Sequence, residues 1–227
     1  MGYPSIEEIK EVSKEWRFIN ELPNELEGFT KTVPLDIKGN ILTLCSYTNA
    51  AIKGKVDIIY TGETFDYILE RALGFNIYRD IRFIYKEKDI FAAKVKPALP
   101  TILKGMEDPS LVNLGEMVAK KQILNWEYGN NLPEKIGAFE LYIKPSKAIE
   151  HINGSIILLD YSDFIRKDQF LVYYNRLRDQ FFGELKIAGV FRDTKDFDAK
   201  NLTQLQENLE KHLVTTLERV TNGSHEI

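Results

Sequence analysis

The most informative segment of the sequence is Ile156-Ile157-Leu158-Leu159-Asp160-Tyr161-Ser162-Asp163. Four consecutive apolar residues are typical of a strand that is covered on both faces of a sheet. A long aromatic segment follows at 168–182, and a second strand-like run follows at 185–191. Read as strand, helix and strand, this order predicts a crossover, in which residues 161–184 connect two strands of one sheet.

Two helices are expected after this strand. The segment 168–182 carries aromatic residues over more than one helical stripe, which predicts a helix buried from two sides, with a partner-binding aromatic strip as the alternative. At 202–220, leucines recur every three or four positions, and Gly223 follows as a stop signal. We expect this last helix to dock on the sheet, and a homodimer through the C-terminal helix is the alternative.

The N-terminal half predicts a different arrangement. Ser5 and Glu8 form a capping box, which predicts a helix as far as about Asn20. Short links between strand-like runs favour an antiparallel meander. The expected strands are 33–37, 41–47, 55–60 and 80–85. The expected helices are 64–73, a helix from 89 that Pro97 and Pro100 interrupt, and 112–126.

These elements predict the α/β or α+β class: a mixed β-sheet with an N-terminal antiparallel meander and helices packed on it. We expect a single globular domain over 1–227, with the best candidate for a subdomain boundary at 127–136, where glycine, asparagine and proline gather. No repeat of fixed period is visible in the sequence.

Composition and charge favour an ordinary globular protein. Hydrophobic residues make up 44% and charged residues 28% of the chain. The net charge of −4 argues against nucleic-acid binding, which usually requires a basic surplus. No apolar run is long enough to span a membrane, and Met1–Ile6 contains no apolar segment of a secretory signal. The lone Cys45 cannot form an internal disulfide, so we expect a cytoplasmic protein.

The first candidate site is the polar end of the apolar strand. Asp160, Ser162 and Asp163 could supply oxygen ligands to a hard cation such as Mg²⁺. Ligands often lie just beyond the carboxyl ends of strands. The structural alternative is that these side chains cap the following turn.

The second candidate is Thr61-Gly62-Glu63-Thr64, which we expect to join a strand to a helix. The free N–H groups at a helix N-terminus favour an anion. However, the phosphate-loop pattern is missing, and Glu63 would repel a phosphate, so ordinary capping is the preferred interpretation. Thr61, Gly62 and Thr64 remain candidate ligand-binding residues.

No catalytic or cofactor motif is recognisable. The three histidines, His151, His212 and His225, are far apart in sequence and predict no zinc site. No nucleophile elbow or dinucleotide-binding pattern occurs, so no cofactor is expected. The sequence therefore favours a non-catalytic binding or regulatory module, whose partner is a small molecule or a protein. The alternative is an enzyme with a carboxylate-based, Mg²⁺-assisted site at Asp160–Asp163.

Overall fold

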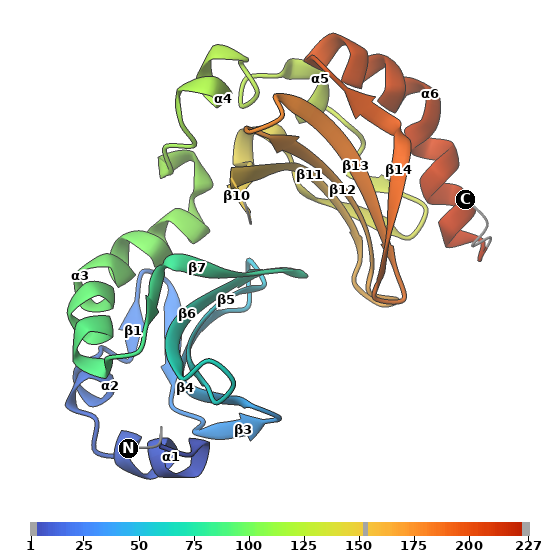
Figure 1. The fold of residues 1–227 in the computed structure, drawn as a ribbon. Helices are drawn as coiled ribbons and strands as arrows, with labels where there is room; N and C mark the ends of the chain where they lie inside the picture. The colour runs from blue at the N-terminus through green and yellow to red at the C-terminus, as the bar shows by residue number, and fades with distance from the viewer. Residues whose placement is uncertain (1–3, 152–153, 224–227) are drawn as a thin grey trace. The chain divides into compact units, whose positions relative to one another are not determined.

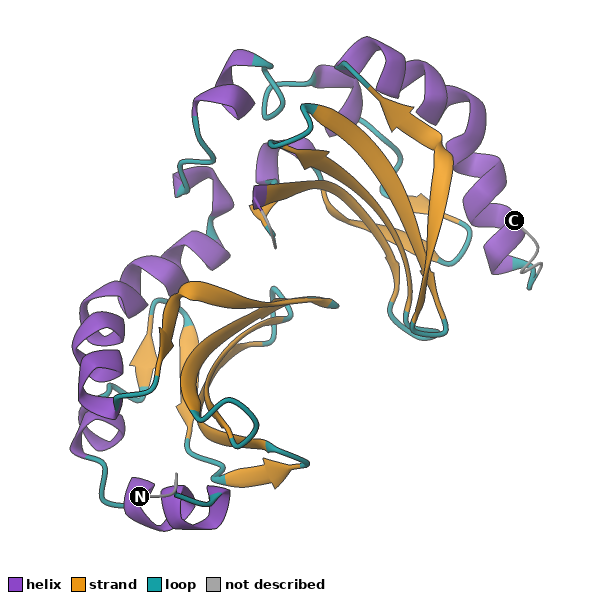
Figure 2. Cartoon of the chain, viewed as in Figure 1, coloured by secondary structure: helices purple, strands orange, loops and turns teal. Residues whose placement is uncertain are grey.

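The computed structural model of the chain describes residues 4–151 and 154–223. The chain divides into two compact units, Met1–Leu111 and Val112–Ile227, called here the N-terminal and C-terminal units (Figures 1 and 2). The division lies before the segment 127–136, where the sequence placed its subdomain boundary. Each unit has its own sheet and its own apolar core.

The N-terminal unit contains one seven-stranded sheet, ordered β1-β2-β4-β5-β6-β7, with β3 paired to β4. Its strands are β1 (Glu25–Leu26), β2 (Phe29–Thr32), β3 (Asp36–Lys38), β4 (Ile41–Asn49), β5 (Gly54–Thr61), β6 (Asp66–Leu73) and β7 (Asn76–Tyr85). Its helices are α1 (Ile6–Ser13), α2 (Arg17–Glu21), α3 (Lys88–Glu107) and the short 3-10 helix Pro109–Leu111. All described strand pairs are antiparallel.

Local sequence explains how this unit is built. The capping box between Ser5 and Glu8 is present at the start of α1. Helix α3 packs along β5, β6 and β7, as Figure 1 shows, because its buried stripe includes Phe91, Val95 and Leu99. Burying each such side chain contributes roughly 1.5–3 kcal/mol, so this stripe fixes the helix on the sheet.

The C-terminal unit contains a second seven-stranded sheet, ordered β14-β13-β12-β11-β9-β8, with β10 paired to β11. Its strands are β8 (Lys135–Ile136), β9 (Phe139–Ile143), β10 (Ile149–Glu150), β11 (Ser155–Asp163), β12 (Asp168–Asn175), β13 (Gln180–Ile187) and β14 (Val190–Ala199). Its helices are α4 (Glu116–Lys120), α5 (Glu127–Asn130), α6 (Leu202–Thr221) and the short 3-10 helix Pro145–Lys147.

Two predictions for this unit are confirmed. The apolar segment 156–159 lies in strand β11, as predicted. All nine residues of this strand are buried. The last helix is α6, which begins after the cap Asn201 and packs on β14. Its leucine stripe lies in the core of the unit, so this face of α6 is occupied within its own unit.

The two units repeat one fold. Each begins with two short helices and a two-stranded hairpin, continues with a short strand on the first long strand, and ends with a four-stranded meander and a 20-residue helix. The first long strand of each unit has an irregularity at the same point, between Thr43 and Cys45 in β4 and between Ile157 and Leu159 in β11. The two units therefore share their strand connectivity and also a register irregularity at the same position of the first long strand.

Side-chain contacts repeat as well. The Tyr47 hydroxyl donates to the Pro23 carbonyl at 2.5 Å, and the Tyr161 hydroxyl donates to the Pro133 carbonyl at 2.6 Å. Residues shared at equivalent positions are Trp16 and Trp126, Asn20 and Asn130, Leu22 and Leu132, Pro23 and Pro133, and Phe29 and Phe139. These pairs are 110 positions apart, whereas Tyr47 and Tyr161 are 114 apart. The change of spacing explains why no repeat of fixed period is visible.

The α/β class and the N-terminal antiparallel meander are confirmed, but several expected elements are wrong. The expected helix at 168–182 is instead the hairpin of β12 and β13, so residues 161–184 form no crossover. The expected helix at 64–73 is instead strand β6. In both segments, strand pairing satisfies the backbone and overrides the helical spacing of apolar residues.

Helix boundaries also differ from the predictions. The first expected helix is interrupted between Ser13 and Arg17. Helix α3 continues through Pro97 and Pro100, because its buried stripe holds it on the sheet despite the two missing backbone donors. Only α4 forms within the expected helix at 112–126, and the segment 127–136 contains α5 and β8.

Candidate functional site

The predicted residues Asp160 and Ser162 lie on β11 with no solvent exposure. The Asp160 carboxylate accepts hydrogen bonds from the Ser162 hydroxyl at 2.7 Å and from the Gln169 side-chain amide at 2.9 Å. Because both carboxylate oxygens have protein donors, this group is a closed polar network within the sheet.

Asp163 ends the same strand and organises the turn to β12. One of its carboxylate oxygens accepts hydrogen bonds from the backbone N–H groups of Ile165 and Arg166, at 2.9 and 3.0 Å. Asp163 therefore caps the turn, which is the structural role expected for it if it is not a metal ligand. Among the described residues, no group of three or more His, Cys, Asp or Glu side chains could hold a metal ion.

Thr61 ends strand β5, and Gly62 and Thr64 lie in the turn that leads to β6. The hydroxyl oxygens of Thr61 and Thr64 are 2.6 Å apart, and the Gly62 N–H donates to the Asn40 carbonyl. Because a strand follows this turn instead of a helix, the helix N-terminus on which the anion site depended is missing. These residues belong to the N-terminal unit, and Asp160, Ser162 and Asp163 belong to the C-terminal unit.

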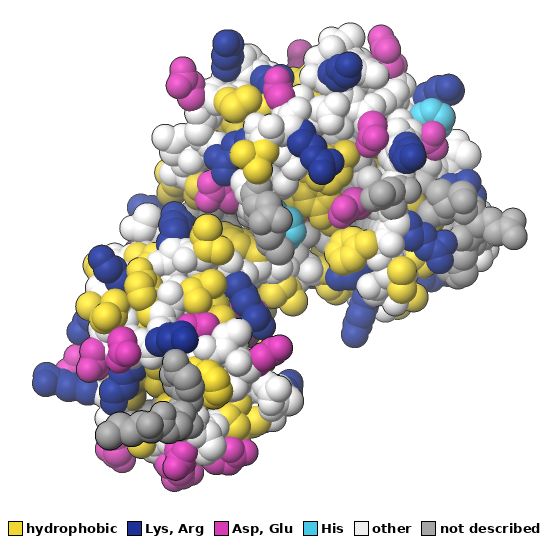
Figure 3. Space-filling view, in the orientation of Figure 1, with side chains coloured by type: hydrophobic (Ala, Val, Ile, Leu, Met, Phe, Trp, Pro, Cys, Tyr) yellow, Lys and Arg dark blue, Asp and Glu magenta, His cyan; other side chains and the backbone are white. Residues whose placement is uncertain are grey.

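The C-terminal unit contains a pocket that sequence reasoning missed. Its volume is about 580 Å³, and its lining comes from β12, β13, β14 and the segment around β10 and β11. The lining residues are His151, Ser155, Tyr173, Asn175, Arg178, Phe182, Gly183, Glu184, Phe191, Lys195 and Asp198. On the face of this unit seen in Figure 3, hydrophobic, acidic and basic side chains lie interspersed.

An aromatic pair contributes to the pocket lining. Tyr173 on β12 and Phe182 on β13 are register partners, and their rings stack with centroids 5.0 Å apart and planes 18° apart. The ring of His151 lies 5.7 Å from that of Tyr173. Cross-strand aromatic pairs of this kind stabilise a hairpin, and they also present a rigid apolar surface to a ligand.

Burial sets the protonation states in the pocket. It lowers the pKa of His151 from 6.5 to about 4, so this imidazole is neutral at pH 7. Burial raises the pKa of Tyr173, and the charge and hydrogen bond of Glu184 raise it further. The phenol therefore remains a hydrogen-bond donor beside the Glu184 carboxylate.

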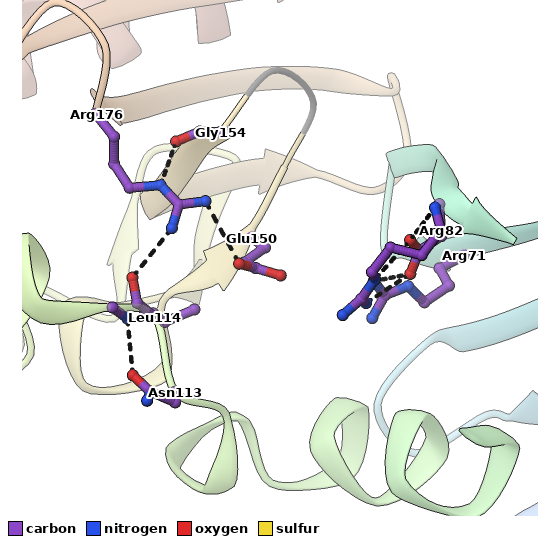
Figure 4. A network of polar contacts seen from close by, with 9 residues as sticks. Arg71, Arg82, Asn113, Leu114, Glu150, Gly154 and Arg176 are labelled. Carbon is purple, nitrogen blue, oxygen red and sulfur yellow. Dashed lines mark hydrogen bonds and ion pairs between the residues drawn. The ribbon is translucent and has the colours of Figure 1, made fainter. Parts of the chain in front are cut away.

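Arg176 supports the wall of this pocket. Its guanidinium donates to the carbonyl oxygens of Gly154 at 2.8 Å and Leu114 at 3.4 Å, and it lies 3.4 Å from the Glu150 carboxylate (Figure 4). Gly154 and Glu150 are the chain neighbours of two lining residues, Ser155 and His151. This arginine therefore contacts the chain neighbour of each of these two lining residues.

The internal repeat distinguishes residues required by the fold from residues special to the pocket. Strand register makes Tyr173 and Phe182 equivalent to Ile59 and Ile68 in the N-terminal unit, and Lys195 is equivalent to Ile81. Gly62 stands where the C-terminal unit has Arg176. The first copy of the fold therefore has isoleucines where the second has Tyr173, Phe182 and Lys195.

The structure defines the protein as a tandem repeat of an antiparallel α/β unit with a pocket on its second copy. No family model matches the sequence, and no curated protein or solved structure matches it significantly. In the part of the chain that the structure describes, no helix has the length and apolarity needed to cross a membrane.

Proposed function

We propose that this chain is a non-catalytic binding module, and that its C-terminal unit binds a small organic molecule in the pocket around Tyr173 and Phe182. The observation that carries the proposal is the pocket itself. Its volume of about 580 Å³ falls within the range of small-molecule sites, and its lining combines the aromatic residues Tyr173, Phe182 and Phe191 with several polar and charged side chains. The N-terminal unit has Ile59 and Ile68 at the equivalent positions, so the aromatic pair is a feature of the second copy alone.

The chemistry of the lining favours binding over catalysis. His151 is the imidazole of this pocket, and burial lowers its pKa to about 4. A base this weak is poorly matched to proton abstraction near neutral pH, because general bases work best when their pKa lies near the working pH. Ser155, which also lines the pocket, would therefore lack a strong activating base in this imidazole.

The alternative, a carboxylate-based and Mg²⁺-assisted enzyme, has weaker support. Asp160 is fully buried, and both of its carboxylate oxygens accept hydrogen bonds from side chains. Asp163 uses a carboxylate oxygen to cap backbone amides. A cation at this position would have to displace these donors before it could bind.

A ligand screen with an internal control tests the proposal. Wild-type protein and the double variant Tyr173→Ile/Phe182→Ile would be screened by thermal shift against a metabolite library. The double variant installs the residues that the same fold carries at Ile59 and Ile68, so we expect it to fold. Ile81→Lys, a change at an 85% exposed position of the N-terminal unit, is the matched control.

The expected result is a compound that raises the melting temperature of the wild type and of Ile81→Lys, but not of the double variant. Circular dichroism checks that all three proteins are folded. A library without any stabilising compound, or equal stabilisation of all three proteins, would remove the support for this pocket as a binding site.

A further inference from the structure

A row of three rings crosses the sheet of the C-terminal unit. His151 follows β10, Tyr173 lies on β12 and Phe182 lies on β13, so the strand order places Tyr173 between the other two. The Tyr173 ring lies 5.7 Å from the His151 ring and 5.0 Å from the Phe182 ring. Tyr173 is only 4% exposed, whereas Phe182 is half-buried. Phe182 is therefore a partly accessible ring on the β14 side of this row.

Strand β14 bulges beside Phe182. Between its register pairs at Phe181 and Gly183, β13 advances two residues, while β14 covers five, from 194 to 199, so β14 has three additional residues here. Such a bulge leaves its additional residues unpaired and bends the strand locally. In the described register, Phe182 is paired with no residue of β14. The pocket lies at this bulge, because two residues of the stretch 194–199 line it together with Phe182.

The N-terminal unit has the same bulge but lacks the rings. Between its register pairs at Ile68 and Glu70, β6 advances two residues, while β7 covers five, from 79 to 84. Ile68 occupies the position of Phe182, and Ile59 occupies the position of Tyr173. The bulge is thus common to both copies, whereas the aromatic pair beside it occurs in the second copy alone.

The charged residues of the pocket alternate in sign. The register places Lys195 beside Glu184. It also places Asp198 beside Phe181, on the side of Arg178. Each end of the pocket therefore has a cation and an anion, and neither end selects a ligand of one charge. Because an ion would lose its hydration without finding a surplus of opposite charge, the lining favours an uncharged molecule.

We propose that this pocket takes an uncharged, planar aromatic molecule, whose ring lies against Phe182 beside the bulge of β14 and extends the row of rings. This inference rests on the proposed binding function and specifies the class of its ligand. Aromatic pairs attract one another beyond the effect of area burial, and this attraction distinguishes a planar ring from a saturated one. The volume of about 580 Å³ leaves room for a molecule of two fused rings.

Four probes of one carbon skeleton test this inference by NMR titration of the full chain. They are naphthalenemethanol, its saturated analogue decahydronaphthalenemethanol, and two charged forms, naphthoate and naphthylmethylammonium. We expect the aromatic alcohol to bind about twofold to tenfold more tightly than its saturated analogue, which corresponds to the ~0.5–1.5 kcal/mol that an aromatic pair contributes beyond burial. Neither charged form should bind more tightly than the aromatic alcohol, because the charges of the lining balance.

Two variants and one wild-type measurement assign the preference to Phe182. In Phe182→Leu, the aromatic alcohol should lose its advantage over the saturated analogue, because an apolar contact remains while the ring is removed. Phe75→Leu removes a half-buried ring from the N-terminal unit and should preserve the advantage. In wild-type protein with labelled phenylalanine rings, nuclear Overhauser effects should connect the bound alcohol to the Phe182 ring, whether or not Phe182→Leu folds.

The outcomes distinguish this inference from the proposed function. The aromatic ligand would be overturned by equal affinity for the alcohol and its saturated analogue, by tighter binding of either charged form, or by an advantage that persists in Phe182→Leu. Overhauser effects that omit Phe182, or no binding of any probe, would overturn it as well. The binding function would survive if compounds from the thermal-shift screen still required Tyr173 and Phe182. Both proposals fail together if neither probes nor screened compounds bind this pocket.

Discussion

At the scale of single residues, the same chemical group has different roles according to its surroundings. Asp163 and Asp160 are three positions apart on one strand, yet one caps a turn and the other joins a closed network with Ser162. Both positions could be read from the sequence, but the donors that surround Asp160 could not. Gln169 reaches Asp160 from the neighbouring strand, and the sequence does not reveal that pairing.

His151 provides a prediction at this scale. Its pKa falls from 6.5 in an unfolded chain to about 4 in the folded protein, so between these values the unfolded state binds more protons. The free energy of unfolding should therefore decrease as the pH falls from 6.5 to 4, by up to about 3 kcal/mol from this residue for a pKa change from 6.5 to about 4.

Replacing His151 with Gln should remove this contribution and flatten the pH dependence over the same interval. Urea denaturation at closely spaced pH values measures it, and the difference between wild type and variant isolates His151 from the titrating carboxylates. A variant whose curve runs parallel to that of the wild type from pH 6.5 to 4 would show that His151 is not buried in its neutral form.

For helices and strands, a prediction succeeded where the spacing of apolar residues within one segment identified a single type of secondary structure. Strand β11 and helix α6 were predictable, because a continuous apolar run and a leucine stripe each identify one structure. The hairpin of β12 and β13 was not. Both Tyr173 and Tyr174 are buried, so alternation between a buried and an exposed face is lost and the segment resembles a helix.

The pocket residues were missed for the same reason. Tyr173 and Phe182 meet only because the hairpin puts them in register. His151 and Lys195 come from other strands or their connections. A usable signal was nevertheless present, since 170–174 is a run of aromatic and branched apolar residues, and aromatic and β-branched residues are enriched in strands.

The hydrogen bonds of Tyr47 and Tyr161 to proline carbonyls should make similar contributions to the stability of the two units. Tyr47 and Tyr161 each donate to the carbonyl of a proline that precedes the first hairpin of its unit. Replacing either with Phe should lower the free energy of unfolding of that unit by about 1 kcal/mol, because one partly buried hydrogen bond is lost. Chemical denaturation of each variant measures the effect. Markedly unequal losses would mean that the repeated contacts do not contribute equally.

A substitution in helix α3 is expected to stabilise the protein. Pro97 lies in its interior and is exposed, whereas α6 has Lys211 at the equivalent position. Proline costs about 3 kcal/mol relative to alanine inside a helix, and part of this cost is offset by its restriction of the unfolded chain. Pro97→Lys should therefore stabilise the N-terminal unit by about 1–2 kcal/mol.

The readout for Pro97→Lys is the urea midpoint of the N-terminal unit, with Lys211→Ala as the control that leaves α3 unchanged. A lower midpoint for Pro97→Lys would indicate that the proline is required for the path of this helix.

At the scale of the whole molecule, the chain is a duplicated fold in which the two copies have diverged. The fold retains Trp16 and Trp126, and both copies anchor a tyrosine to the proline that precedes the first hairpin. The sheet face equivalent to the pocket carries isoleucines in the first copy. Sequence reasoning did not detect the duplication, because the shared residues are few and their spacing changes from 110 to 114 positions.

Because each unit has its own apolar core, we expect each unit to fold without the other. Fragments 1–111 and 112–227 should each fold when expressed alone, since each contains a complete sheet and a complete apolar cluster. Dispersed amide signals in the NMR spectrum of each fragment, and a cooperative melt for each, are the expected results. An unfolded fragment would mean that the unit needs the remainder of the chain.

We have proposed that the C-terminal unit binds a small molecule on its Tyr173–Phe182 surface. Crystals of the full chain soaked with a fragment library test it most directly. We expect electron density for bound fragments in contact with Tyr173 or Phe182, and none against the equivalent Ile59 and Ile68. A pocket that stays empty throughout the library, or fragments that gather only on other surfaces, would contradict it.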